Sequence, residues 1–413
     1  MRKAFISSQS NTPHTLLLVL FLIQIIAIFF AEFSDYSNYV LYPIWALWVA
    51  VILTSEIILN RNERAFIKVS FVFLMIVLFY WVIGYSSTVI GDVLNNINWI
   101  MVGVISLYVL KLFSERELFV VYITLAIASL ILLVTYISMG RVLMAVEQIE
   151  EAALVTSAWY GSLSMILSGL SLIVFIHVKS TFPRIISITF FILTLYLNFF
   201  VLQRGTNVIF TFSEIGILLV FNLKRKSLVY FLSFVIVVLA IYVYSSGLLI
   251  VFFDGLADII PSDRLASRFR EISSALYYED IGAGSGSLSG RNELIMQSFH
   301  TFTSSVRCFF FGAGEHFSDN NIIGHHSFII DTFARYGIIG GVLMFIYFKK
   351  QYQIIMSFLN KHKDWTLYMQ CAIVFMFYIL RNIYGVFAYT LVNLFILVFF
   401  PLTFQIINYY KKQ

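Results

Sequence analysis

The sequence predicts an all-α polytopic membrane protein with about twelve transmembrane helices and one large loop between the ninth and tenth. Of the 413 residues, 60% are hydrophobic and only 12% are charged, whereas soluble domains are roughly 45–50% apolar. The apolar residues also gather into runs of about 17–25 residues, long enough to cross a hydrocarbon core about 30 Å thick. These predicted spans begin near Thr15, Val40, Phe66, Ile97, Leu118, Ala158, Ile185, Thr206, Leu228, Phe328, Leu367 and Val386.

Lysine and arginine in the short loops set the predicted orientation, because cytoplasmic loops carry the excess of basic residues. We assign the side with this excess to the cytoplasm, so both termini are cytoplasmic and the net charge of +5 reflects topology, not nucleic-acid binding. The first run is a span and not a cleaved signal, because Glu32 and Asp35 follow it without a small-residue cleavage site. The basic side carries Arg2, Lys3, Arg61, Arg64, Lys68, Lys111, Arg116, Lys179, Arg184, Lys224, Arg225, Lys226, Lys349, Lys350, Lys361, Lys363, Lys411 and Lys412.

The opposite, outer side of the membrane holds basic residues of one kind only. All are arginines, whose planar guanidinium can bind a phosphate through two parallel hydrogen bonds, whereas lysine offers a flexible point charge. This asymmetry favours recognition of a phosphorylated ligand; the alternative is that selection for topology alone removed lysine from this side. The residues are Arg141, Arg204, Arg264, Arg268, Arg270, Arg291, Arg307, Arg335 and Arg381.

We interpret residues 1–413 as one transmembrane domain whose largest extramembrane segment, 254–324, is an outer loop with short helices. The loop is too short to form an independent catalytic domain with a large core. Its first part, from Asp263 to Glu271, is a candidate mixed-charge helix. The Gly/Ser-rich stretch 277–289 predicts a mobile connection that can open and close over a bound lipid headgroup.

Arg204 lies at the predicted outer hairpin between the seventh and eighth spans. An Arg at mid-membrane costs about 2.5–3.5 kcal/mol even on insertion scales, and intramembrane charges usually face a cavity or a partner. We interpret Arg204 as a ligand for pyrophosphate at the membrane surface; the alternative is that its side chain extends to lipid phosphates. Glu214, about two turns deeper in the eighth span, could pair with a cation or relay a proton.

Arg291 follows Ser289 at the start of a predicted helix in the outer loop. Ser289 precedes an apolar periodic run and can cap that helix, which places Arg291 in its first turn. A helix N-terminus favours anions through its free N–H groups, so a cation beside it predicts a phosphate site. Glu293, in the same stretch, is a candidate substrate-binding residue.

The pair His325-His326 opens the tenth predicted span. Adjacent histidines project in different directions, which argues against a metal site built from both. A neutral imidazole can accept a hydroxyl proton near neutral pH, so one of the two is a candidate general base. The alternative role is capping of the helix.

The same span contains further candidates. Asp331 and Arg335 are four residues apart and can pair across one helical turn. Arg335 is also a candidate substrate contact, as is Arg381 at the last predicted outer hairpin. A close approach of helices is permitted by Gly337, Gly340 and Gly341.

The spacing after the histidine pair resembles a family signature. His326-Ser327 is followed by nine residues and then by Gly337-Ile338-Ile339-Gly340. This arrangement resembles the His-(Asn/Ser/Gln)-x9-Gly-x-x-Gly pattern of the O-antigen polymerase and O-antigen ligase family, whose members are integral membrane glycosyltransferases. The resemblance implies that His326 is the catalytic histidine, and we assign His325 to substrate binding.

Two arginines extend the resemblance. An Arg at a hairpin such as that of Arg204 recurs in the family, and Ser-Gly-Arg ending at Arg291, followed by a helix and Phe311-Gly312-Ala313-Gly314, resembles the family's outer loop. The resemblance implies that Arg204 and Arg291 are catalytic. The sequence departs from the family at Phe309-Phe310-Phe311, which stands where Pro often precedes the glycine pair.

Arg204, Arg291 and His326 all fall at the outer interface when the topology is drawn from the inner-loop charges alone. Chemistry at this face has little access to nucleotide sugars or ATP, so the energy has to reside in the substrate. A sugar attached through pyrophosphate to a polyprenyl lipid meets this requirement. The sequence has no Gly-rich nucleotide loop, no Cys/His metal cluster and no paired-Asp motif, so we expect neither cofactor nor metal.

In family terms the resemblance implies a polymerase of O-antigen or capsule repeat units in the cytoplasmic membrane, acting by inverting, metal-independent transfer. Its expected partners are polyprenyl-pyrophosphate-linked oligosaccharides, membrane lipid, and flippase and chain-length regulator proteins. One alternative is an O-antigen ligase that uses lipid A-core as acceptor. The other is a transporter or flippase of lipid-linked glycans, against which the sequence shows neither inverted repeats nor broken midplane helices.

Overall fold

The computed structural model describes residues 11–31, 37–55, 57–82, 90–146, 149–198, 205–222, 247–260, 263–277, 287–314, 323–324, 327–359, 364–383 and 389–412. Within these residues every regular element is a helix, which confirms the predicted all-α fold class. In chain order the elements are α1 (Asn11–Ala31), α2 (Ser37–Thr54), α3 (Arg61–Val82), α4 (Ile90–Leu112), α5 (Glu115–Val146), α6 (Ile149–His177), α7 (Thr181–Tyr196), α8 (Gly205–Phe221), α10 (Leu248–Ile259), α11 (Asp263–Tyr277), α12 (Ser287–Thr303), α13 (Val306–Phe311), α14 (Phe328–Ser357), α15 (Trp365–Ile383), α16 (Tyr389–Leu394), the π-helical η3 (Phe395–Phe399) and α17 (Phe400–Lys412).

The helices are those of a multi-pass membrane protein. Among the described residues, four stretches are long and apolar enough to cross a membrane, namely Glu115–Thr135, Phe328–Ser357, Trp365–Ile383 and Val392–Tyr410. Shorter apolar stretches lie in α1, α2, α4, α6, α7 and α8. The count of twelve spans stays a prediction, and most of the ninth predicted span lies outside the described residues.

Burial in the bundle follows the pattern expected of helices in lipid. Large apolar side chains are exposed on its outside, among them Leu16, Met75 and Ile131. Polar side chains inside the bundle join helices to one another, because lipid offers them no partners. Asn393 of α16 accepts from Gln351 of α14 at 2.7 Å and donates to the Trp99 carbonyl of α4 at 3.0 Å.

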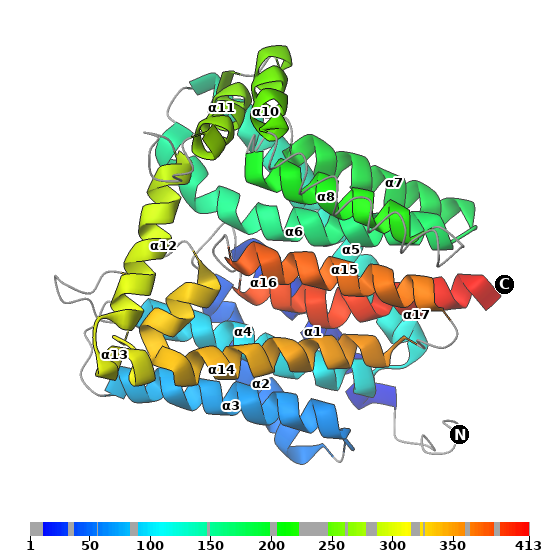
Figure 1. Cartoon of the computed structure of the whole chain (residues 1–413). Coiled ribbons are helices and arrows are strands. Elements are labelled where there is room, and N and C mark those ends of the chain that lie inside the picture. Colours follow the sequence, from blue (N-terminus) through cyan, green and yellow to red (C-terminus); the bar gives the residue numbers. More distant parts are fainter. Residues whose placement is uncertain are drawn as a thin grey trace.

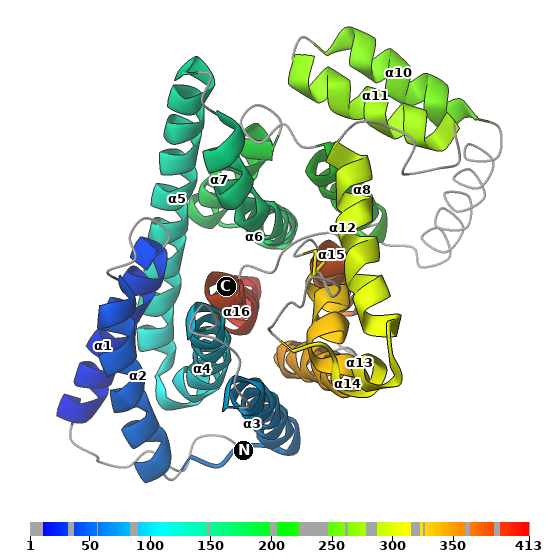
Figure 2. The same ribbon diagram turned by 90° about the vertical axis from the view of Figure 1, so that its left-hand side faces the viewer.

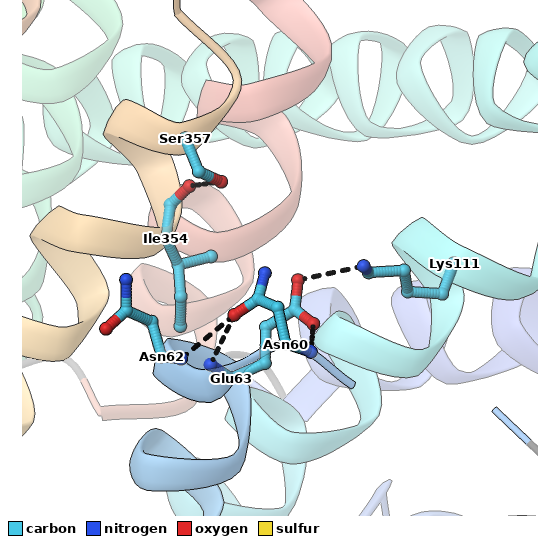
Figure 3. Close-up of polar contacts among 6 residues, drawn as sticks. All are labelled: Asn60, Asn62, Glu63, Lys111, Ile354 and Ser357. Atoms are coloured by element: carbon cyan, nitrogen blue, oxygen red, sulfur yellow. Dashed lines mark hydrogen bonds and ion pairs between the residues drawn. The ribbon is translucent and has the colours of Figure 1, made fainter. Parts of the chain in front are cut away.

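Polar contacts join three helices at one end of the bundle, which we call the basic end; Figure 3 shows those at the start of α3 and its ion pair with α4. Asn60 caps α3, since its Oδ1 accepts from the N–H of Asn62 and of Glu63, while Glu63 Oε2 accepts from the Asn60 N–H at 2.7 Å. Glu63 Oε1 lies 3.1 Å from Lys111 Nζ of α4. Lys350 of α14 donates to Asn62 Oδ1 at 3.2 Å. Three segments predicted to share the cytoplasmic side therefore meet at one end.

Helices of the predicted outer loop lie at the opposite end of the bundle. α12 runs across the ends of the parallel helices instead of along them (Figures 1 and 2), and both α12 and α13 pack on α14. α10 and α11 form a hairpin in which the rings of Phe253 and Phe269 stack with centroids 5.8 Å apart. The predicted start of the loop at Asp254 falls inside α10, because the apolar run before Asp254 continues as one helix through Ile259.

α14 turns back on itself at Gly337 (Figure 1), where the backbone has φ 64° and ψ −165°. Its first segment, 328–336, packs against the second, 338–357. The ring centroids of Phe328 and Phe348 are 6.4 Å apart, although 20 residues of straight helix would separate them by about 30 Å. The first segment is therefore re-entrant, and its buried N-terminus points into the bundle. The sequence shows no sign of this break, which lies beside α13 and not at the middle of the bundle.

Candidate functional site

The backbone on both sides of the His325-His326 pair is held by two buried side chains. Ser298 of α12 accepts from the Gly324 N–H at 2.8 Å and donates to Asp331 Oδ1 of α14 at 2.5 Å. The second oxygen of Asp331 accepts from the Ser327 N–H at 3.2 Å. Gly324 and Ser327 directly flank the pair, so its two ends are fixed to one hydrogen-bonded network, which we call the Ser298–Asp331 network.

Ser327 caps the re-entrant segment of α14. Its side chain accepts from the Ile330 N–H at 3.3 Å, and its carbonyl accepts from the Asp331 N–H at 2.7 Å. The predicted alternative, in which a histidine caps this helix, is therefore wrong, because a serine supplies the capping oxygen. His325 and His326 themselves lie outside the described residues.

α12 brings the Arg291 stretch to the same place. Gly324 lies so close to α12 that a Cβ on it would overlap the Leu294 carbonyl. Leu294 is three residues, about one helical turn, from Arg291. α12 begins at Ser287, two residues before the predicted cap Ser289, so Arg291 lies in the second turn and not in the first. Helix ends are the least certain part of any sequence-based prediction, because neighbouring serines can serve equally as caps.

Of the two candidate residues on α12, the structure describes the side chain of Glu293 but not that of Arg291. Glu293 is exposed to solvent at the opposite end of the bundle from the Lys111 and Lys350 contacts. The backbone of Arg291 is described, but its side chain lies outside the described part of the structure, as does Arg204 entirely.

Arg335 lies at the other end of the re-entrant segment. Its carbonyl accepts from the Gly314 N–H at 2.9 Å, and the preceding Ala334 carbonyl accepts from the Ala313 N–H at 2.8 Å. The break at Gly337 interrupts the helical hydrogen bonding of these carbonyls, and the loop after α13 supplies the donors in its place. The structure therefore puts Arg335 about two turns away from Ser327, at the start of the helix.

The glycines of the signature serve this fold-back. A Cβ on Gly337 would overlap the Phe310 carbonyl of α13, and a Cβ on Gly312, at φ 79°, would overlap the Arg335 carbonyl. A Cβ on Gly341 would overlap the Phe333 ring of the re-entrant segment. The predicted close approach therefore occurs, but the approaching parts are α13 and the helix's own first segment and not a separate transmembrane helix.

Arg381 is buried near the C-terminal end of α15, with 2% of its surface exposed. α15 runs antiparallel to α8, since Gln370 donates to the Leu218 carbonyl at 3.3 Å and the rings of Phe210 and Phe377 lie 6.3 Å apart. In this register Arg381 is level with the first turn of α8, which begins directly after Arg204. A buried cation at this level needs compensating groups, which is typical of functional positions in membrane proteins.

An aromatic series connects α15 to the start of α14. Tyr378, one turn from Arg381, lies 5.8 Å from Phe348 between ring centroids, and Phe348 lies 6.4 Å from Phe328. The structure thus brings Arg381, the start of the re-entrant segment and α12 to one region, while Arg335 lies farther off.

Sequence reasoning missed Ser298, and it assigned Asp331 a different partner. One carboxylate oxygen of Asp331 accepts from the Ser298 hydroxyl, and the other accepts from the Ser327 N–H. This role of Asp331 was hard to predict, because the carboxylate of a capping box stands three residues after the capping serine, whereas Asp331 stands four residues after Ser327. Ser298 gave no signal, because its partners are distant in sequence.

The described residues contain no group of three or more His, Cys, Asp or Glu side chains that could hold a metal ion. Cys308 and Cys371 are both buried and are not joined by a disulfide.

No protein-family model matches the chain, and no curated protein matches it.

Proposed function

We propose that this protein is a polysaccharide polymerase of the bacterial cytoplasmic membrane, with both termini in the cytoplasm. It transfers a glycan from polyprenyl pyrophosphate to a hydroxyl group of a second lipid-linked repeat unit, on the outer face of the membrane. The proposal combines the resemblance around His326 with the arrangement at the end of the bundle opposite the basic end.

The Ser298–Asp331 network is the observation that carries this proposal. It ties α12, which contains Arg291, to the two residues that flank the histidine pair. The helix that carries the candidate phosphate ligand Arg291 is thus in direct contact with the residues on either side of the candidate base, 35 positions away in sequence. Arg381, buried and level with the start of α8, supports a third cationic position near the same region.

The chemical step follows from these assignments. His326 takes the proton of the acceptor hydroxyl as its oxygen attacks the anomeric carbon of the donor sugar. The bond from that carbon to the pyrophosphate breaks, a glycosidic bond forms, and the configuration inverts. Arg291, Arg204 and Arg381 stabilise the charge that develops on the departing pyrophosphate. His325, Glu293 and, more remotely, Arg335 contact the sugars.

A flippase or transporter of lipid-linked glycans is the second candidate, and the broken helix α14 favours it. Discontinuous helices commonly form substrate sites in transporters. A ligase to lipid A-core shares the histidine signature and is the third candidate.

Surface glycans of cells lacking the protein distinguish the three candidates. Loss of a polymerase leaves single repeat units outside and removes the long chains. Loss of a flippase removes all outer glycan, and loss of a ligase leaves long chains on the polyprenyl carrier. Either of the latter two results would overturn the polymerase proposal.

A further inference from the structure

Glu214 lies midway along α8 and is completely buried. It is packed between α6 and α15, because a Cβ on Gly169 of α6 would overlap Glu214 Oε1 and would also lie 2.8 Å from Val374 of α15. The Ser168 hydroxyl lies beside the carboxyl group, and no other described residue offers either carboxylate oxygen a hydrogen bond. The proposed glycan transfer, at the far end of the bundle, does not use this residue.

Polar side chains lead from Glu214 toward the basic end. Gln370 of α15 donates to the carbonyl of Leu218, about one turn along α8 from Glu214. Its Oε1 lies 2.6 Å from Nε2 of His177, the last residue of α6. His177 is only half-buried and is followed two residues later by Lys179. An imidazole, the kind of side chain that ordinarily changes charge closest to neutral pH, therefore stands at the basic end of these polar groups.

Polar side chains also lie on the other side of Glu214, but none of them titrates near neutral pH. Thr211, about one turn away on α8, accepts from Asn198 at 3.4 Å, and Asn198 accepts from Ser164 of α6 at 3.1 Å. Ser168 lies beside the Glu214 carboxyl group and donates to the Met165 carbonyl at 2.9 Å. Access from this side would pass only buried hydroxyl and amide groups.

The charged groups on the neighbouring helices lie away from Glu214. On α15, Arg381 is two turns beyond Val374, and the intervening titratable side chains are Tyr378 and, toward the basic end, Cys371. On α6, the titratable side chain within 163–177, where the side chains are described, is His177; Glu150, Glu151 and Tyr160 lie in the first half of the helix. α11 reaches α8 near Val208, six residues from Glu214, and its charged residues are Asp263, Arg264, Arg268, Arg270 and Glu271.

A carboxylate held in the membrane interior beside a single hydroxyl group is strongly disfavoured, whereas the neutral acid is tolerated. We propose that Glu214 is a proton-binding site inside the membrane, which gains and loses its proton through Gln370 and His177 at the basic end. In the loading step the imidazolium of His177 gives up one proton and becomes neutral, and the Glu214 carboxylate becomes the acid. This site is separate from the proposed glycan transfer and does not depend on it.

Labelling with dicyclohexylcarbodiimide, a lipid-soluble reagent, tests this proposal. The reagent adds to a protonated carboxyl group to give a stable N-acylurea, which peptide mass spectrometry locates. The purified full-length protein would be reconstituted into vesicles with the basic end facing outward or inward, so that the pH at each side is set separately. Glu63, which is paired with Lys111, is a matched buried carboxylate at the basic end.

We expect Glu214 to be labelled and Glu63 to remain unlabelled. Raising the pH at the basic end should slow the labelling of Glu214, and raising it at the opposite end should not. His177→Phe and Gln370→Leu should remove this dependence in protein whose helix content and melting temperature match the wild type.

Failure of Glu214 to react at any pH would overturn the proposal, as would a labelling rate that follows the pH at the opposite end. If the variants do not fold, the response of wild-type labelling to the pH at each side still shows from which end of the bundle protons reach Glu214. The measurement uses no glycan substrate, so its failure is distinct from failure of the polymerase proposal.

Discussion

Ser298 and Asp331 hold the backbone of Gly324 and Ser327, the residues on either side of the His325-His326 pair, and neither side chain is assigned a part in the proposed transfer. Asp331 accepts hydrogen bonds from Ser298 and from the Ser327 backbone. Hydrogen bonds to a charged group are stronger than those between neutral groups. Removing one partner also leaves the other partner buried without a hydrogen bond.

Replacing Ser298 with Ala should therefore lower the transfer rate while the protein still inserts and folds. The lost hydrogen bonds correspond to about 1.5–3 kcal/mol, or roughly a 10- to 100-fold lower kcat if the whole effect falls on positioning. KM should change little, because Ser298 is assigned no contact with substrate. Steady-state kinetics of the purified protein provide the measurement.

The matched control is Ser304→Ala, which removes an exposed hydroxyl bonded to the Thr301 carbonyl at 2.8 Å. Equal rates in the two variants would exclude a positioning role for Ser298.

Arg291→Lys and Arg204→Lys should each be nearly as damaging as the corresponding Ala variants. A lysine keeps the charge but cannot reproduce the two parallel hydrogen bonds of a guanidinium to a pyrophosphate. Arg270→Lys is the control, since Arg270 is an exposed arginine that pairs with Asp258 at 3.0 Å. Polymer length in complemented cells gives the result, and full-length polymer with both Lys variants would show that the residues supply only charge.

At this scale the sequence identified residue types and their chemistry but not their partners. Arg381 could be named as a cation at an outer hairpin, yet its burial depends on α8 and α15 packing antiparallel. Ser298 could not be found, because its role arises only when α12 meets α14.

At the scale of elements, the fold-back of α14 sets the position of the site. Its first segment returns along the second, so Ser327 begins a buried helix inside the bundle and not at its surface. Gly337 makes this turn in a conformation that is essentially restricted to glycine. The spacing of the signature thus corresponds to the length of the re-entrant segment, since nine residues separate Ser327 from Gly337.

Gly337→Ala should destabilise the protein and abolish transfer. The backbone conformation alone costs about 1–3 kcal/mol with a side chain, and the added Cβ would also overlap the Phe310 carbonyl. Gly216→Ala is the control, because a Cβ at Gly216 in α8 meets nothing within 4 Å. Thermal unfolding in detergent should show a lower melting temperature for the first variant only; equal temperatures would mean that α14 does not require glycine at the turn.

Apolar periodicity could predict where α14 lies but not its reversal. A run that is apolar throughout predicts one continuous span. The break depends on hydrogen bonds from the N–H groups of Ala313 and Gly314 to the carbonyls of Ala334 and Arg335, and these donors lie outside the helix and about 20 residues earlier in the sequence. For the same reason the start of the outer loop was placed at the first charge, Asp254, although α10 continues past it.

At the scale of the whole molecule, the distribution of charge and the packing of the helices agree about which segments share an end. Lys111, Lys350 and the start of α3 were assigned to one side from loop charges alone, and they are in contact. This much could be predicted because lysine placement is selected directly by membrane topology. The number of spans depends on residues whose structure is not described.

A cysteine at Ser267 in α11 should react with an impermeant maleimide in intact cells or spheroplasts, whereas one at Ser357, at the end of α14, should react only after lysis. Both positions are exposed, and the native Cys308 and Cys371 are buried and should contribute little background. The opposite labelling pattern would reverse the assigned orientation and place the proposed site in the cytoplasm.

Glycan transfer by the purified protein, supplied with polyprenyl-pyrophosphate-linked repeat units and no metal, decides whether His326 is the base of a polymerase. We expect the wild-type protein to build polymer with and without chelator. His326→Ala should lower the rate by roughly 10²–10⁴-fold while His325→Ala has the milder effect, because only the former removes a general base. Polymer formation by His326→Ala at the wild-type rate would contradict the assigned mechanism, and absence of any transfer by correctly inserted wild-type protein would contradict the function itself.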